Sequence, residues 1–120
     1  MGATEACATA LGEAVTLYRG LAAADPALYT PLLAQALTEL ARTLEELDRF
    51  DQALECRAEN VARWSHLARL RPRDYDNEVA RARADLAEYC SERRYAPADA
   101  LRATYEASRR SGLESDATTE

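Results

Sequence analysis

The chain has 120 residues, which is the size of a single domain, and it carries a formal net charge of −6 at pH 7. Ala contributes 26 residues and Leu 16, whereas Val contributes three and Ile none, a composition that excludes a β-sandwich or β-barrel. All 15 basic residues are Arg, and the acidic excess argues against general nucleic-acid binding, which requires a basic face.

The helical spacing of the apolar residues predicts five helices in chain order and therefore an all-α fold. They are expected at about residues 4–24, 27–47, 51–70, 75–92 and 97–111. Pro26 cannot continue the first helix, and Asp25 is suited to cap the second. The core-facing side is expected to include Cys7 in the first helix, and Leu101 and Tyr105 in the fifth.

The N-terminus, the cysteines and the last residues bear on location and domain extent. No stretch reaches the roughly 18–20 apolar residues of a membrane helix, and no secretory signal is recognisable, so we expect no membrane association. Cys7, Cys56 and Cys90 lie far apart without a C-x-x-C pair, which predicts small buried side chains and a cytoplasmic protein without disulfides. We expect a helical domain over residues 1–111 and a disordered acidic tail over residues 112–120.

An internal repeat relates the first half of the chain to the second. Shifting the sequence by 46 residues aligns Glu13–Glu46 with Glu59–Glu92, with 11 identities in 34 positions and no gap. Ala enrichment accounts for some of these identities. The matches least easily explained by composition are Pro26 with Pro72 and Tyr29 with Tyr75.

A motif that begins in this repeat and extends past its end resembles the tetratricopeptide repeat. Its residues are Leu37, Leu40, Ala41 and Leu44, then Asp48-Arg49-Phe50, then Ala53-Leu54, and its second copy is Arg83, Leu86, Ala87, Cys90, Tyr95 and Ala98. Ala41 and Ala53, and Ala87 and Ala98 in the second copy, occupy the small positions at which helices approach closely. Asp48 stands where the family often has Gly. The segment at Glu13–Tyr29 is similar to a long-helix variant found in actinobacterial signalling proteins.

The resemblance implies an α-solenoid of antiparallel helix hairpins that binds other proteins, as part of a larger signalling or regulatory protein. The first helix of each pair would line the concave side, here residues 27–47 and 75–92. The partner-binding residues expected on that face are Gln35, Thr38, Glu39, Arg42, Glu45, Glu46, Arg81, Asp85, Glu88 and Glu92. Because acids outnumber bases, this face predicts an acidic groove for a basic partner segment and no clamp for a terminal carboxylate. The alternative is an ordinary solvated helix face.

Four single residues require interpretation of their own. Trp64 is expected to anchor the core, and His66, the only histidine, is expected at the surface or its boundary because no triad partner is recognisable. Arg57 and Asn60 stand where small or apolar residues are usual in the related repeat. A buried hydrogen bond from Asn60 to the second helix is one hypothesis for this pair.

Other function classes remain as alternatives. A self-associating assembly domain is one, because an unpaired apolar face on the first helix would need to be covered by another repeat or by a second copy of the chain. A small helical enzyme is less favoured: the sequence has no H-x-x-E or E-x-x-H spacing and no Gly-rich phosphate loop. We therefore expect no catalytic residues, no metal site and no cofactor.

Overall fold

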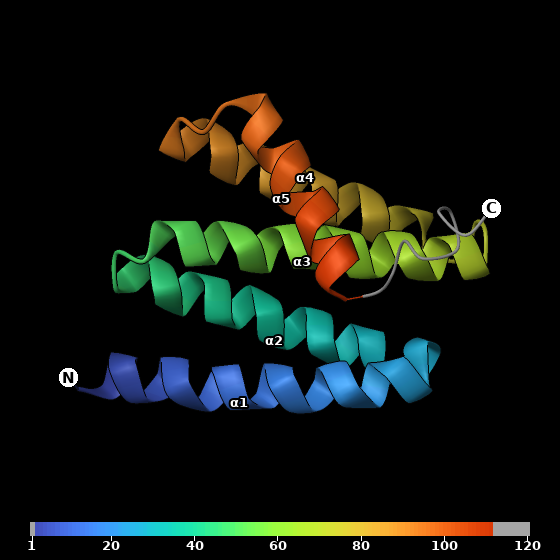
Figure 1. Ribbon diagram of the computed structural model, residues 1–120, viewed down its shortest axis with the longest axis horizontal. Helices are drawn as coiled ribbons and strands as arrows, with labels where there is room; N and C mark the ends of the chain where they lie inside the picture. The colour runs from blue at the N-terminus through green and yellow to red at the C-terminus, as the bar shows by residue number, and fades with distance from the viewer. Residues whose placement is uncertain (1, 112–120) are drawn as a thin grey trace.

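The computed structural model describes residues 2–111, which form five helices joined by short turns (Figure 1). The helices are α1 (Ala3–Ala24), α2 (Pro26–Glu46), α3 (Phe50–Leu70), α4 (Asp76–Arg93) and α5 (Pro97–Arg110). The predicted all-α class is confirmed, and each boundary lies within one residue of its expected position. None of these described helices is long and apolar enough to cross a membrane. The predicted acidic tail, residues 112–120, lies outside the described residues.

Local backbone chemistry explains where the helices break. The Asp25 carboxylate accepts a hydrogen bond from the Leu28 amide at 3.3 Å, and Pro26 occupies the first position of α2. Asp48 follows α2 with a left-handed φ of 60°, and Arg94 follows α4 with a φ of 62°. Asp tolerates this conformation better than most residues, which explains how Asp48 replaces the Gly of the related turn.

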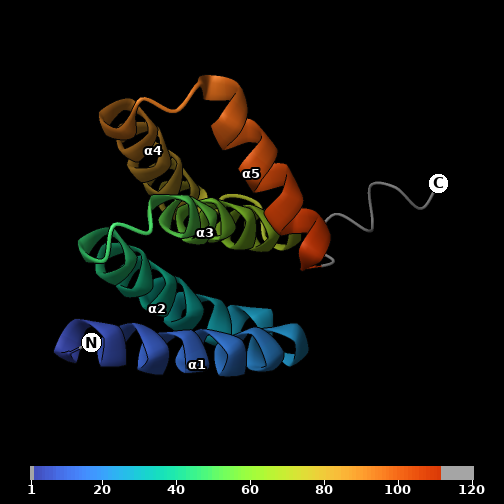
Figure 2. The ribbon, with the colours of Figure 1, turned by 60° about the vertical axis from the view of Figure 1, so that its left-hand side comes forward.

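Helices α1 to α4 lie side by side in chain order, and α5 crosses back over α3 (Figures 1 and 2). α3 therefore packs against α2, α4 and α5, whereas the main neighbour of α1 is α2 alone. The core lies along α2 and α3, where Leu33, Leu37, Ala41 and Ala53 are 0% exposed. The burial predicted for Ala41 and Ala53 is confirmed, and the missing side-chain bulk lets these two helices approach closely.

Several residues that were expected in the core are exposed instead. Cys7 of α1 is exposed, as are Ala87 of α4 and Ala98 of α5, both of which the repeat places at close helix contacts. Leu101 is 75% exposed and Tyr105 is 55% exposed. These five predictions are wrong.

The packing partners of each helix explain these corrections. α2 has a helix on either side and buries residues on both, but α4 packs mainly against α3 and has only a small contact with α5, which leaves Ala87 uncovered. α5 turns a side with Ala100, Ala103 and Ala107 toward α3, so its bulky residues point outward. Small residues allow the crossing helices to pack closely, and periodicity alone did not favour this stripe over the neighbouring one.

The solenoid arrangement stays a prediction. Short turns join neighbouring helices as antiparallel hairpins require. α5, however, packs more against α3 than against α4, its partner in the last predicted pair.

Candidate functional site

Four of the ten predicted partner-binding residues line one groove, which we call the acidic groove. They are Glu45 from α2 and Asp85, Glu88 and Glu92 from α4, joined by Arg57 from α3 and by Tyr89. The groove has a volume of about 200 Å³. Spacings of three and four residues place the acids of α4 on one side of the helix. The groove thus combines four carboxylates with a single guanidinium.

Arg57 shows how this groove holds a guanidinium. Its Nη2 donates to Glu45 Oε2 at 2.6 Å and its Nε donates to the same oxygen at 3.1 Å. Its Cζ also lies 5.0 Å from the centre of the Tyr89 ring, which is a cation–π contact. The Tyr89 hydroxyl donates to the Phe50 carbonyl oxygen at 2.9 Å, so the ring is fixed in place. Burial, followed by the charge of Glu45, raises the pKa of Tyr89.

The position of Glu45 is electrostatically unfavourable within its own helix. Glu45 and Glu46 end α2, whose last turn contains no basic residue. The C-terminus of a helix carries partial negative charge and disfavours nearby acids. Arg57 offsets this repulsion at Glu45 only. The two acids at this end of α2 therefore do not stabilise the helix, and a role at the surface explains them better.

The other six predicted residues lie elsewhere on α2 and α4. They are Gln35, Thr38, Glu39, Arg42, Glu46 and Arg81, and none of these six lines the acidic groove. All are exposed except Thr38, which is half-buried and donates its hydroxyl hydrogen to the Ala34 carbonyl oxygen at 2.9 Å. The predicted face is therefore only partly gathered into one surface.

A larger cavity was missed by sequence reasoning, and we call it the arginine cavity. It has a volume of about 640 Å³ and lies among α1, the start of α2, α3 and the end of α5. Its charged lining comprises Arg19, Glu59, Arg63 and Arg110, and the only histidine, His66, also lines it. Three guanidinium groups therefore face one carboxylate.

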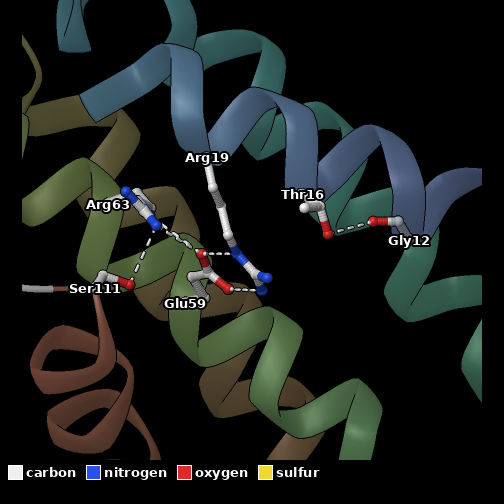
Figure 3. A network of polar contacts seen from close by, with 6 residues as sticks. All are labelled: Gly12, Thr16, Arg19, Glu59, Arg63 and Ser111. Carbon is white, nitrogen blue, oxygen red and sulfur yellow. Dashed lines mark hydrogen bonds and ion pairs between the residues drawn. The ribbon is translucent and has the colours of Figure 1, made fainter. Parts of the chain in front are cut away.

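Glu59 lies between two of these arginines (Figure 3). Arg19 approaches from α1 and donates from Nε at 3.0 Å and from Nη2 at 2.7 Å, one bond to each carboxylate oxygen. Arg63, one turn along α3, donates from Nε to Glu59 at 3.1 Å and from Nη2 to Ser111 Oγ at 3.1 Å. The side chains of Glu59 and Arg63 are only 3% and 8% exposed. This cluster therefore ties α1, α3 and the end of α5 together.

The protonation state of the cluster follows from these contacts. Burial alone would raise the pKa of Glu59, but the hydrogen bonds and charges of Arg19 and Arg63 outweigh it and hold that pKa below its ordinary value. The hydrogen bond to Glu59 raises the pKa of Arg19. Glu59 and Arg19 are consequently ionised at neutral pH.

A signal for this cluster was present in the sequence. Glu59 and Arg63 are four residues apart, the spacing of a helical ion pair, yet both lie among core residues such as Ala58 and Ala62. Buried charges are rare unless paired, so this pattern predicts a partner from another helix. Arg19 supplies that partner.

The structure also places the single residues that required interpretation. Trp64 is half-buried beside the core, and its ring centre lies 5.9 Å from that of Tyr75. The hypothesis of a hydrogen bond from Asn60 to α2 is wrong for its oxygen, since Oδ1 is buried without a partner among the described residues. Arg57 does contact α2, through Glu45.

Comparisons with protein-family models, with curated proteins and with solved structures found no match to this chain. The resemblance to the tetratricopeptide repeat accordingly stays a prediction from the motif. Function has to be argued from the two sites themselves, because neither a relative nor a structural neighbour supplies it.

Proposed function

We propose that this chain is a protein-interaction module whose acidic groove binds a basic, arginine-bearing segment of a partner protein. The proposal rests on the way the groove binds the Arg57 side chain. Its guanidinium forms a 2.6 Å ion pair with Glu45 and a cation–π contact with the Tyr89 ring. Proteins use these same two interactions to bind the guanidinium of a partner's arginine. Three further carboxylates in the same groove have no ion pair with a described residue and would meet additional basic side chains.

Charge supports the same assignment. The four acids and the one arginine give the acidic groove a formal charge of −3, which is half of the net charge of the whole chain. A concentrated negative surface accelerates encounter with a basic segment and disfavours an acidic one. The contacts of Glu88 and Asp85 would be partly solvated, so the affinity should fall as salt is added.

Fluorescence anisotropy with a labelled peptide of alternating Arg and Gly tests the proposal. A second peptide with citrulline at each Arg position has nearly the same shape without the charge, and we expect it to bind far more weakly. The double variant Asp85→Asn, Glu88→Gln should weaken binding of the Arg peptide about fivefold or more, which corresponds to about 1 kcal/mol.

A matched control separates the groove from bulk charge. The variant Glu39→Gln, Glu46→Gln removes the same two charges from exposed positions outside the groove, and it should leave the dissociation constant within about twofold. Equal weakening by both double variants, or equal binding of the citrulline peptide, would show that the groove is not the binding site.

Self-association through the N-terminal hairpin is a second candidate, favoured by one specific observation. Leu17 of α1 is 64% exposed and Leu28 of α2 is 58% exposed. Light scattering over a range of concentrations tests it, with Leu17→Glu expected to produce the monomer and Leu101→Glu on α5 as the matched control. A monomer at every concentration excludes this candidate.

A further inference from the structure

The arginine cavity has the dimensions and walls of a small-molecule site. Its volume of about 640 Å³ falls within the roughly 300–1,000 Å³ typical of ligand pockets. Its apolar lining comes from short side chains, including Ala22, Ala23 and Pro26, which leave room for a compact carbon skeleton. It is separate from the acidic groove, since the two share no lining residue.

The charge of the cavity is opposite to that of the chain. Arg19, Arg63 and Arg110 supply three positive charges and Glu59 one negative charge, which leaves an excess of two positive charges. The chain as a whole has a net charge of −6, so this concentration of arginine is not a consequence of overall composition. A recess with an excess of one sign of charge raises the local concentration of ligands of the other sign.

Arg19 and Arg63 are positioned in advance of binding. Glu59 engages Nε and Nη2 of Arg19 and Nε of Arg63, which orients both guanidinium planes from a buried carboxylate. Nη1 of Arg19 takes no part in this pair, and a guanidinium offers five N–H donors in all. Donors held rigid before binding lose less entropy when a ligand arrives.

Arg110 completes the set from the end of α5. Its side chain is exposed, and within residues 2–111 no ion pair involves it. It also lines a neighbouring cavity of about 410 Å³, which shares Arg19 and Glu59 with the arginine cavity. Arg110 is therefore the arginine of this cavity that Glu59 does not engage, and it can contact anionic oxygens of a ligand that Arg19 and Arg63 leave unpaired.

We propose that the arginine cavity binds a small dianionic molecule, a dicarboxylate or a phosphate monoester, whose two negative charges match its excess of two positive charges. A guanidinium can donate two parallel hydrogen bonds to a carboxylate or to a phosphate, so the same arginines would recognise either ligand. Arg19 and Arg63 contact one carboxylate of a dicarboxylate and Arg110 contacts the other, whereas the oxygens of a single phosphate group are shared among the three arginines. The site is independent of the acidic groove and of any protein partner.

Isothermal titration calorimetry on the full chain at low salt tests this site with three probes. Succinate represents the dicarboxylates, glycerol phosphate represents the phosphate monoesters, and succinamide is the neutral counterpart of succinate. We expect saturable binding of one molecule per chain for at least one of the two anions and none for succinamide. The anion that binds more tightly shows whether the site prefers a dicarboxylate or a phosphate monoester.

Two variants with equal charge change locate the binding. Arg110→Gln should raise the dissociation constant of the anion about tenfold or more, because the substitution removes a charge-assisted contact. Arg81 is an exposed arginine of α4 that lines no part of this cavity. Arg81→Gln should therefore leave the dissociation constant of the anion within about twofold. The proposal is overturned if neither anion saturates, if succinamide binds as tightly, or if both variants weaken binding equally.

Discussion

Replacing Glu59 with Gln should destabilise the fold, because the amide removes the negative charge between Arg19 and Arg63. The Arg63 side chain is only 8% exposed, so its guanidinium would stay buried without a counter-charge. Removing one partner of a buried ion pair costs about 3–5 kcal/mol. Arg19 is 45% exposed and can be hydrated, so its share is below about 1 kcal/mol.

We expect a loss of about 3 kcal/mol in the free energy of unfolding at pH 7, the lower end of that range. The lower end applies because Arg63 keeps its hydrogen bond to Ser111 and the introduced side-chain amide can still accept one through its carbonyl oxygen. For a chain of this length, the loss corresponds to a fall of about 10 °C in melting temperature.

The dependence on pH gives a second and independent signature. The pKa of Glu59 in the folded chain lies below its ordinary value of 4.5. Between these two values the unfolded chain binds a proton that the folded chain does not, so the stabilisation is complete above about pH 4.5 and is lost as pH falls through the folded pKa. The difference between wild type and Glu59→Gln should therefore shrink in acid.

Urea unfolding followed by far-UV circular dichroism, at pH 7 and at pH 3, measures both effects. Glu55→Gln removes a charge from an exposed position one turn earlier on α3 and should change stability by less than about 0.5 kcal/mol. If Glu59→Gln were as mild as this control, or if its cost were the same at both pH values, the reasoning about the buried charges would be refuted.

Three further predictions follow from the described contacts. A thiol reagent at pH 8 should label the exposed Cys7 quickly and Cys56 and Cys90 only after unfolding, since both are buried and burial raises the pKa of Cys56 to about 12; rapid labelling of all three would contradict this. Tyr89→Phe should cost about 1 kcal/mol in a urea titration, because it removes the 2.9 Å hydrogen bond from the hydroxyl to a backbone carbonyl, and an unchanged midpoint would count against that bond. Asn60→Leu should raise the melting temperature by removing a buried oxygen without a partner among the described residues; a clear decrease would mean that the oxygen is satisfied.

The extent of the helices could be predicted from sequence, because their limits depend on local chemistry. Pro26 and Asp25 define a break whatever surrounds them, and the apolar period indicates helix over the whole of α2 and α3. The neighbours of each helix are not a local property. Ala41 and Ala87 are equivalent in the repeat, yet Ala41 is 0% exposed between two helices and Ala87 lies on an uncovered side of α4.

The candidate sites illustrate the same division. Counting acids on one side of α2 and α4 was enough to select Glu45 and Glu88, which the fold brings into one groove. The arginine cavity depends on Arg19 and Glu59, which are 40 residues apart and meet only because α1 and α3 flank α2. No spacing rule links such residues in a single sequence.

The most direct test of the proposed function is a two-dimensional amide NMR titration of the full chain with the alternating Arg–Gly peptide. Our account predicts saturable shift changes gathered at Asp85, Glu88 and Glu92 on α4 and at Glu45 on α2, with the amides of Ala22 and Ala23 at the arginine cavity unchanged. Shift changes centred on the arginine cavity, or no saturable change at all, would contradict it.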